Sequence, residues 1–149
     1  MKTLLKCLIP LILALAGCRE SRWLREFELN EKSFDSEAMQ MVQDQAKLSI
    51  PAGARGLNFR YSPPIDPSFI ARIEIPRSES AAFITQIEAM PNEAINISGG
   101  LVEKVKWWPP PGTPTLVDRQ HNQSDGSYLR LVVREEGGQT ILYVRHAVF

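Results

Sequence analysis

Two alternating segments separated by a pair of glycines constrain this chain more than any other feature. The segments 128–134 and 140–148 carry hydrophobic residues at every second position, and Gly137-Gly138 lie between them. Alternation with period two is typical of a half-buried β-strand. A glycine pair between two such segments predicts a β-hairpin with a two-residue turn. The chain is therefore expected to end in a hairpin that forms part of a sheet.

The position of the turn also predicts the register of this hairpin. On the core face, three hydrophobic residues lie opposite three residues of the second strand: Leu129, Leu131 and Val133 opposite His146, Val144 and Leu142. The other face pairs Val132 with Tyr143 and Arg130 with Arg145, and it also carries Tyr128. A β-bulge would shift all of these pairs, so the register depends on the turn.

The preceding part of the chain contains both helical and extended patterns. Helical spacing of hydrophobic residues occurs over 33–48 and 78–90, and alternation occurs over 57–61 and 69–75. An irregular stretch, 92–125, leads to the hairpin. We expect an α+β domain of two layers: a mostly antiparallel sheet of about four to five strands, with two helices on one face and the C-terminal β-hairpin.

The first eighteen residues have the pattern of a bacterial export signal. Lys2 and Lys6 begin it, and an apolar run follows over 7–15. At about 1.5 Å per residue, this run is too short to cross a hydrocarbon core about 30 Å thick. The run ends in Leu15-Ala16-Gly17-Cys18, which resembles the lipobox of bacterial lipoproteins. The alternative is a plain secretory signal with a cysteine at this place by chance.

The resemblance to bacterial lipoproteins implies processing at the lipobox. Cleavage would follow Gly17, and Cys18 would carry a diacylglyceryl thioether and a fatty acyl chain on its new amine. The chain would then comprise a removed signal peptide (1–17), a lipidated tether (18–30) and one α+β domain (31–149). Two or three acyl chains hold a protein on a membrane essentially permanently.

The same resemblance implies a lipid-anchored protein of the bacterial cell envelope. Arg19 follows the cysteine, where an aspartate is the usual cue for retention in the inner membrane. The protein is therefore expected on the outer membrane, facing the periplasm, if the cell is Gram-negative. In a Gram-positive cell the anchor would leave the domain outside the plasma membrane. No cofactor is expected besides the covalent lipid, and the net charge of zero gives no field for binding nucleic acid.

A second, shorter resemblance concerns the mature part. The segments Ile50-Pro51-Ala52-Gly53-Ala54 and Trp107-Trp108-Pro109 resemble those of small bacterial envelope lipoproteins, over residues 48–149. This resemblance implies no activity.

Six residues are candidates for binding a partner. Trp107 and Trp108 precede three prolines, which would present the indole rings stiffly to a glycan or a protein. The alternative is that one of the two rings fills the gap between a helix and the sheet, with the prolines covering it. The remaining four share one face of the hairpin and could hold a carboxylate, a phosphate or an acidic partner: Tyr128, Arg130, Tyr143 and Arg145. The alternative is a solvated face on which Glu135, Glu103 or Glu74 neutralises the arginines.

The two histidines are candidates for catalysis or metal binding. His121 lies in a polar stretch with Asp118 and Asp125, and the alternative there is a solvated loop. His146 is expected on the core face as a packing residue. No Gly-x-Ser-x-Gly elbow or phosphate-binding loop accompanies them, so we assign no catalytic residue and no metal ligand.

Together these features favour a function in binding over one in catalysis. We expect a lipid-anchored envelope protein that is a non-enzymatic binding or accessory module for another envelope component. The alternatives are a lipoprotein that binds peptidoglycan or another glycan, and an envelope hydrolase.

Overall fold

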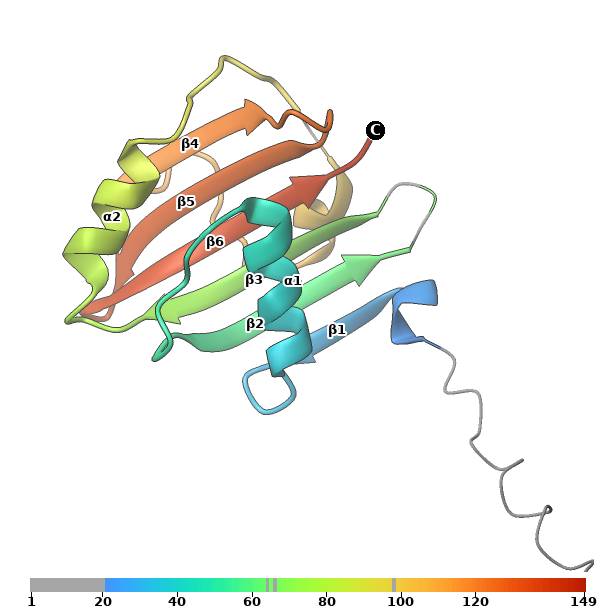
Figure 1. The fold of residues 1–149 in the computed structure, drawn as a ribbon, viewed down its shortest axis with the longest axis horizontal. Helices are drawn as coiled ribbons and strands as arrows, with labels where there is room; N and C mark the ends of the chain where they lie inside the picture. Colours follow the sequence, from blue (N-terminus) through green and yellow to red (C-terminus); the bar gives the residue numbers. More distant parts are fainter. Residues whose placement is uncertain (1–20, 64, 66, 98) are drawn as a thin grey trace, which may run out of the picture.

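Six antiparallel strands form one sheet in the computed structural model of this protein (Figure 1). The structure describes residues 21–63, 65, 67–97 and 99–149. The lipobox and Cys18 lie outside the described residues. The strands, in chain order, are β1 (Phe27–Asn30), β2 (Arg55–Ser62), β3 (Ser68–Ile75), β4 (Val117–Asn122), β5 (Tyr128–Glu136) and β6 (Gln139–Ala147). Their order across the sheet is β1-β2-β3-β6-β5-β4, so β6 is a central strand.

Both predicted helices are present, and both cover the same face of the sheet (Figure 1). They are α1 (Ser36–Ala46) and α2 (Ser80–Glu88), and two short 3₁₀ helices, η1 (Arg22–Leu24) and η2 (Gly100–Lys104), accompany them. Asp35 caps α1, because its carboxylate accepts a hydrogen bond of 3.0 Å from the Ala38 amide. The helix ends where Lys47 adopts a left-handed conformation, with φ of 52°.

The predicted hairpin is confirmed, including its register. Gly137 and Gly138 both have positive φ and form the turn between β5 and β6. Leu131 pairs with Val144 on the helix-covered face, and Arg130 pairs with Arg145 on the other. No bulge interrupts this strand pair. The α+β fold class is therefore as expected.

The sheet has six strands, where four to five were expected, because two edge strands were not predicted. Phe27–Asn30 belong to the stretch assigned to the tether, but they pair with β2 as β1. The folded region thus begins before residue 31. Val117–Asn122 belong to the irregular stretch, but they pair with β5 as β4. Both strands are polar at alternate or most positions, as edge strands commonly are.

The residues before β1 are docked on the domain. Trp23 lies edge-on to Phe27 and to Tyr61, with 5.1 Å between ring centroids in each case. Arg22 forms an ion pair of 2.6 Å with Asp35, the residue that caps α1. The chain therefore enters the fold at η1, beside the outer strand of the sheet.

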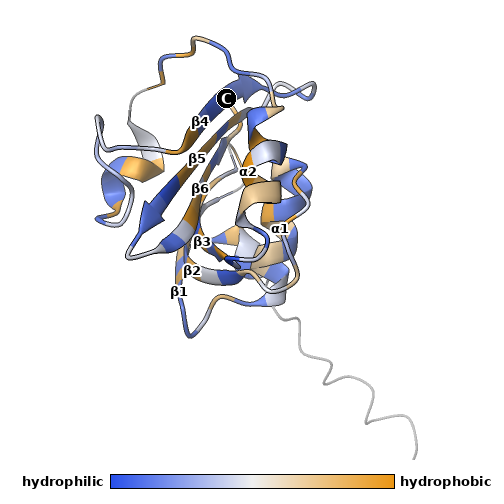
Figure 2. Cartoon of the chain, turned by 90° about the vertical axis from the view of Figure 1, so that its left-hand side faces the viewer, coloured by the Kyte–Doolittle hydropathy of each residue, from blue (hydrophilic) through white to orange (hydrophobic). Residues whose placement is uncertain are grey.

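The sheet is covered on both faces. The main core lies under the helices, where Val42 of α1 and Ile87 of α2 are fully buried against residues such as Phe59 and Leu142. The opposite face is covered by residues 99–116, which we call the cover segment; Figure 2 shows it across the sheet from the helices. None of the helices in the described ranges is both long and apolar enough to cross a membrane.

Candidate functional site

The four predicted hairpin residues share the face that lies under the cover segment. Tyr128 and Arg130 on β5, and Tyr143 and Arg145 on β6, all point away from the helices, because strand residues two apart share a face. The structure thus brings these four together as predicted. It differs in one respect: the face is not open, and Tyr128, Tyr143 and Arg145 are buried beneath the cover segment and its neighbours.

The two tryptophans belong to that cover. The Trp108 ring lies edge-on to Tyr143, with centroids 5.7 Å apart. The indole nitrogen of Trp107 donates a hydrogen bond of 3.3 Å to Glu28 on β1. Both rings are half-buried against a small cluster that contains Val132 and Ile141. The rings therefore both pack on the sheet and present part of their surface outside.

Arg130 is neutralised by Asp118, and not by any of the glutamates considered from the sequence. Its guanidinium donates two hydrogen bonds to this carboxylate, of 2.7 and 3.1 Å. The pairing required β4, because Asp118 reaches Arg130 only as part of a strand beside β5. On the same face of the sheet, the Tyr128 hydroxyl donates a hydrogen bond of 2.8 Å to the side-chain oxygen of Gln120. The side-chain nitrogen of Gln120 donates a hydrogen bond of 2.8 Å to the Ile95 carbonyl.

Tyr143 belongs to a second polar network. Its hydroxyl donates to Glu136 at 2.5 Å and accepts a hydrogen bond of 3.1 Å from Arg72. Glu136 also forms ion pairs with Arg72 and Arg134. Burial, together with the Glu136 carboxylate, raises the pKa of Tyr143 to about 12. The phenol is therefore neutral at physiological pH and acts as a hydrogen-bond donor.

Arg145 is solvated by backbone carbonyl groups. It is only 7% exposed, and it donates hydrogen bonds to the carbonyls of Gly99, at 3.1 Å, and Ile97, at 3.4 Å. Its guanidinium also lies 5.6 Å from the centre of the Tyr128 ring. Burial lowers the pKa of this guanidinium from its usual value. Within the described part of the chain, no carboxylate lies within ion-pair distance of Arg145. Its contacts hold the start of the cover segment on the sheet.

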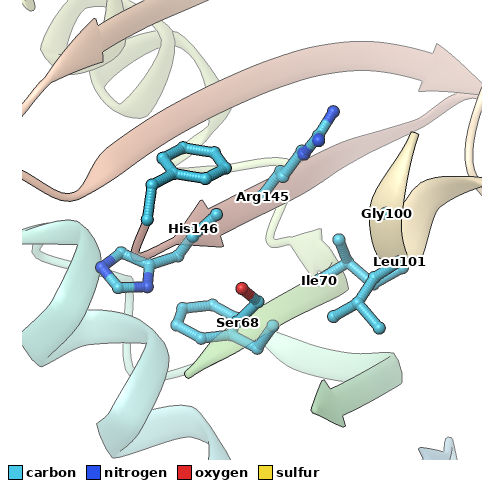
Figure 3. Close-up of a pocket in the computed structure, with 9 residues that line it drawn as sticks. Ser68, Ile70, Gly100, Leu101, Arg145 and His146 are labelled. Atoms are coloured by element: carbon cyan, nitrogen blue, oxygen red, sulfur yellow. The ribbon is translucent and has the colours of Figure 1, made fainter. Parts of the chain in front are cut away.

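A cavity of about 80 Å³ lies beside Arg145 at the end of β6. Its lining includes Ser68 and Ile70 of β3, Leu101 of η2, and Phe149. Figure 3 shows the side chains of Arg145 and His146 leaving β6 in different directions. They therefore do not converge on one bound group, and the cavity has room only for a group of a few atoms.

The two histidines are packed on the helix-covered face. His121 is part of β4, not of a solvated loop, and its Cα pairs with Leu129, which in turn pairs with His146. Two strand spacings, roughly 10 Å, therefore separate their backbones. Asp118 leaves the opposite face of β4, so the set of Asp118, His121 and Asp125 is not brought together. Among the described residues, no three His, Cys, Asp or Glu side chains are grouped closely enough to hold a metal ion.

The pH dependence of stability is expected to report on His146. The ring is 3% exposed and stacks on Phe69 with centroids 5.2 Å apart, and its Nε2 has no hydrogen-bond partner among the described residues. Burial lowers its pKa from 6.5, and the Asp125 charge opposes this only in part. As the pH falls through 6.5, the unfolded chain therefore binds a proton before the folded chain does, and stability is lost.

We expect the urea concentration at the midpoint of unfolding to decrease as the pH is lowered from about 7 to about 5. This range lies above the pH at which carboxylates titrate. The variant His146→Phe keeps a ring against Phe69 but removes the titrating group. Its midpoint should change much less over this range. An equal change in both proteins would assign the pH dependence to another group.

Sequence reasoning missed the parts of this site that come from β4 and from the start of the cover segment. Asp118 and Gln120 lie on one face of β4, but their neighbours are also polar. The sequence therefore lacks the alternation of polar and hydrophobic residues that indicates a strand. The glycines at 99 and 100, both with positive φ, were a local signal for a tight turn.

Comparisons with protein-family models, curated proteins and solved structures found no match for this chain.

Proposed function

We propose that this protein is a lipid-anchored protein of the bacterial cell envelope, and that its domain is a binding or accessory module for another envelope component. The observation that carries the proposal is the motif Leu15-Ala16-Gly17-Cys18, followed by a folded domain whose first described element begins at Arg22. The anchor would place the domain at a membrane surface, on the periplasmic side of the outer membrane if the cell is Gram-negative.

The cover segment is the surface that we propose for the partner. It belongs to the connection between α2 and β4, which occupies 89–116 and in which η2 is the only regular element among the described residues. Connections longer than about 12 to 15 residues are uncommon in compact domains, and when ordered they are usually functional. Binding residues are also found disproportionately on loops held by a rigid scaffold.

The chemistry of the cover segment suits a protein surface. Trp107 and Trp108 are half-buried, and aromatic side chains that are partly anchored in this way are frequent binding hot spots. The exposed prolines that follow them, such as Pro111, restrict the backbone. Arg145 fixes the other end of the segment through the Gly99 carbonyl. A partner would therefore meet a surface that loses little conformational entropy on binding.

Replacing Cys18 with alanine tests the anchor. We expect the variant to lose incorporation of labelled fatty acid completely, and to accumulate as a longer, unprocessed chain, because the sulfur that accepts the diacylglyceryl group is absent. Metabolic labelling and the mass of the purified protein measure both effects. Cys7→Ala is the matched control and should be labelled and processed normally. Normal labelling of the Cys18→Ala protein would overturn the anchor.

Site-directed crosslinking in intact cells tests the binding surface. A photoreactive amino acid at Pro111 in the cover segment should capture one abundant envelope component. The same amino acid at Ala82, exposed on α2 on the other side of the sheet, is the control and should not capture it. Equal capture at both positions, or none at Pro111, would remove the cover segment as the binding surface.

Peptidoglycan is the second candidate partner, favoured by the two neighbouring indole rings, because aromatic rings stack on sugars. In that case the protein should sediment with purified cell wall, and Trp107→Ala should reduce the sedimented fraction. Trp107 is the better position to test, since Trp108 also packs on Tyr143. Sedimentation that is unchanged in Trp107→Ala would count against a glycan site at this residue.

A further inference from the structure

We propose that one end of the sheet docks directly on the bilayer in which Cys18 is anchored, an inference that rests on the lipidation proposed above. This end, which we call the proximal end, contains the start of β1, the β2–β3 connection, the β4–β5 turn and the end of β6. Because the sheet is antiparallel throughout, these four segments lie at the same end of the sheet (Figure 1).

The length of chain between the anchor and the fold is the first argument. Only four residue steps separate Cys18 from Arg22, the first residue of η1. At no more than about 3.6 Å per residue, covalent geometry limits this distance to roughly 14 Å. The η1 helix precedes β1 and therefore lies at the proximal end. The Cα atom of Arg22, at this end, is thus held within roughly 14 Å of the Cα atom of Cys18, whatever the orientation of the domain.

The distribution of exposed hydrophobic side chains is the second, independent argument. Among the described residues, four large hydrophobic side chains are exposed. Three of them lie at the proximal end: Leu24 (63% exposed), Ile65 (94%) and Phe149 (74%). The fourth, Leu116 (51%), precedes β4 and so lies at the opposite end of the sheet. Single exposed hydrophobic residues are ordinary, but their gathering at the end nearest to a lipid anchor points to a lipid surface.

The three exposed hydrophobic residues are distributed over the proximal end from β1 to the end of β6. Leu24 lies beside β1, Ile65 lies between β2 and β3, and Phe149 follows β6. The β4–β5 turn at the same end is polar, and Ser124 and Asp125 are exposed on it. The part of the proximal end from β1 to the end of β6 therefore inserts its side chains among the lipid headgroups, with Phe149, whose ring lies 6.4 Å from that of Tyr128, nearest to the polar turn.

This orientation has a consequence for the binding surface. When strand ends rest on the bilayer, both faces of the sheet are turned sideways. The helices and the cover segment would then be accessible to partners beside the anchored protein, and neither layer would be pressed against lipid.

The test uses the full-length, lipidated protein in vesicles of phosphatidylethanolamine and phosphatidylglycerol. Both natural cysteines are accounted for, since Cys7 leaves with the signal peptide and the sulfur of Cys18 is alkylated. An environment-sensitive fluorophore is attached to Ile65→Cys, Phe149→Cys or Leu116→Cys, and nitroxide-labelled phospholipids serve as quenchers. Leu116 is the matched control, because it is also hydrophobic and exposed. The mass of each sample reports whether Cys18 carries lipid.

We expect the fluorophores at positions 65 and 149 to lose most of their emission to the quencher, and the fluorophore at 116 to lose little. If Cys18 is lipidated but all three positions are quenched equally, or only 116 is quenched, docking is overturned and the anchored binding module stands. If the protein carries no lipid on Cys18, both the proposed anchor and the proposed docking are overturned.

Discussion

Replacing Phe59 with alanine is expected to lower the free energy of unfolding by about 3–5 kcal/mol, the range for a fully buried phenylalanine. The Phe59 side chain is completely buried on β2. Its ring contacts those of Phe27 and Phe34, both with centroids 5.8 Å away, and stacks on Phe69 at 5.6 Å. The cavity left by the substitution would therefore remove contacts to β1, to the residues before α1 and to β3.

Urea denaturation followed by tryptophan fluorescence measures this loss. The matched control is Phe149→Ala, which removes the same side chain from a position that is 74% exposed and should change the midpoint little. Similar midpoints for the Phe59→Ala protein and the original would show that β1 and β2 do not pack as described. We also expect β1 amides to exchange faster in this variant, because an edge strand of four residues depends on this packing.

Gly56→Ala is expected to destabilise the domain by about 1–3 kcal/mol, the usual cost of overfilling a packed core. A β-carbon at Gly56 would overlap the ring of Phe34. Relieving this overlap would displace the ring from its edge-to-face contact with Phe59, which has an interplanar angle of 77°. Glycine to alanine reduces the entropy of the unfolded chain, but that gain is at most about 1 kcal/mol.

A double-mutant cycle checks the cause of this destabilisation. If the Phe34 ring is the obstacle, the combined variant Gly56→Ala/Phe34→Ala should lose about 0.5–3 kcal/mol less than the two single losses added together. The free energies of unfolding of all four proteins supply the coupling energy. Additive losses would locate the strain in the backbone of β2, which has its register shift between Gly56 and Asn58.

The elements that could be predicted from the sequence are those specified by neighbouring residues. The register of the β5–β6 hairpin was predicted correctly, because the period of its strands and its Gly137-Gly138 turn are local properties. The helix around Val42 was predicted for the same reason, since spacing and a capping carboxylate mark it. The edge strands β1 and β4 were not predicted, because a short polar strand forms only when another strand supplies its hydrogen bonds.

The candidate site was predictable in the same partial way. Alternation was sufficient to place Tyr128, Arg130, Tyr143 and Arg145 on one face. It could not predict the partners of these residues, because Asp118 lies on β4, which was not predicted, and Gly99 lies 46 positions from Arg145 in the chain. Half-burial of Trp107 and Trp108 likewise depends on where the cover segment lies across the sheet.

The sequence by itself determined the hairpin register, the two helices and the lipobox motif, because each is a pattern within about twenty neighbouring residues. Only the tertiary structure decided that β6 lies between β3 and β5, that the aromatic and basic face is covered, and that Leu24, Ile65 and Phe149 share one end of the sheet. The last of these features concerns residues up to 125 positions apart, from Leu24 to Phe149 (149 − 24). Such arrangements depend on which surfaces the folded chain buries together, and no local period encodes that choice.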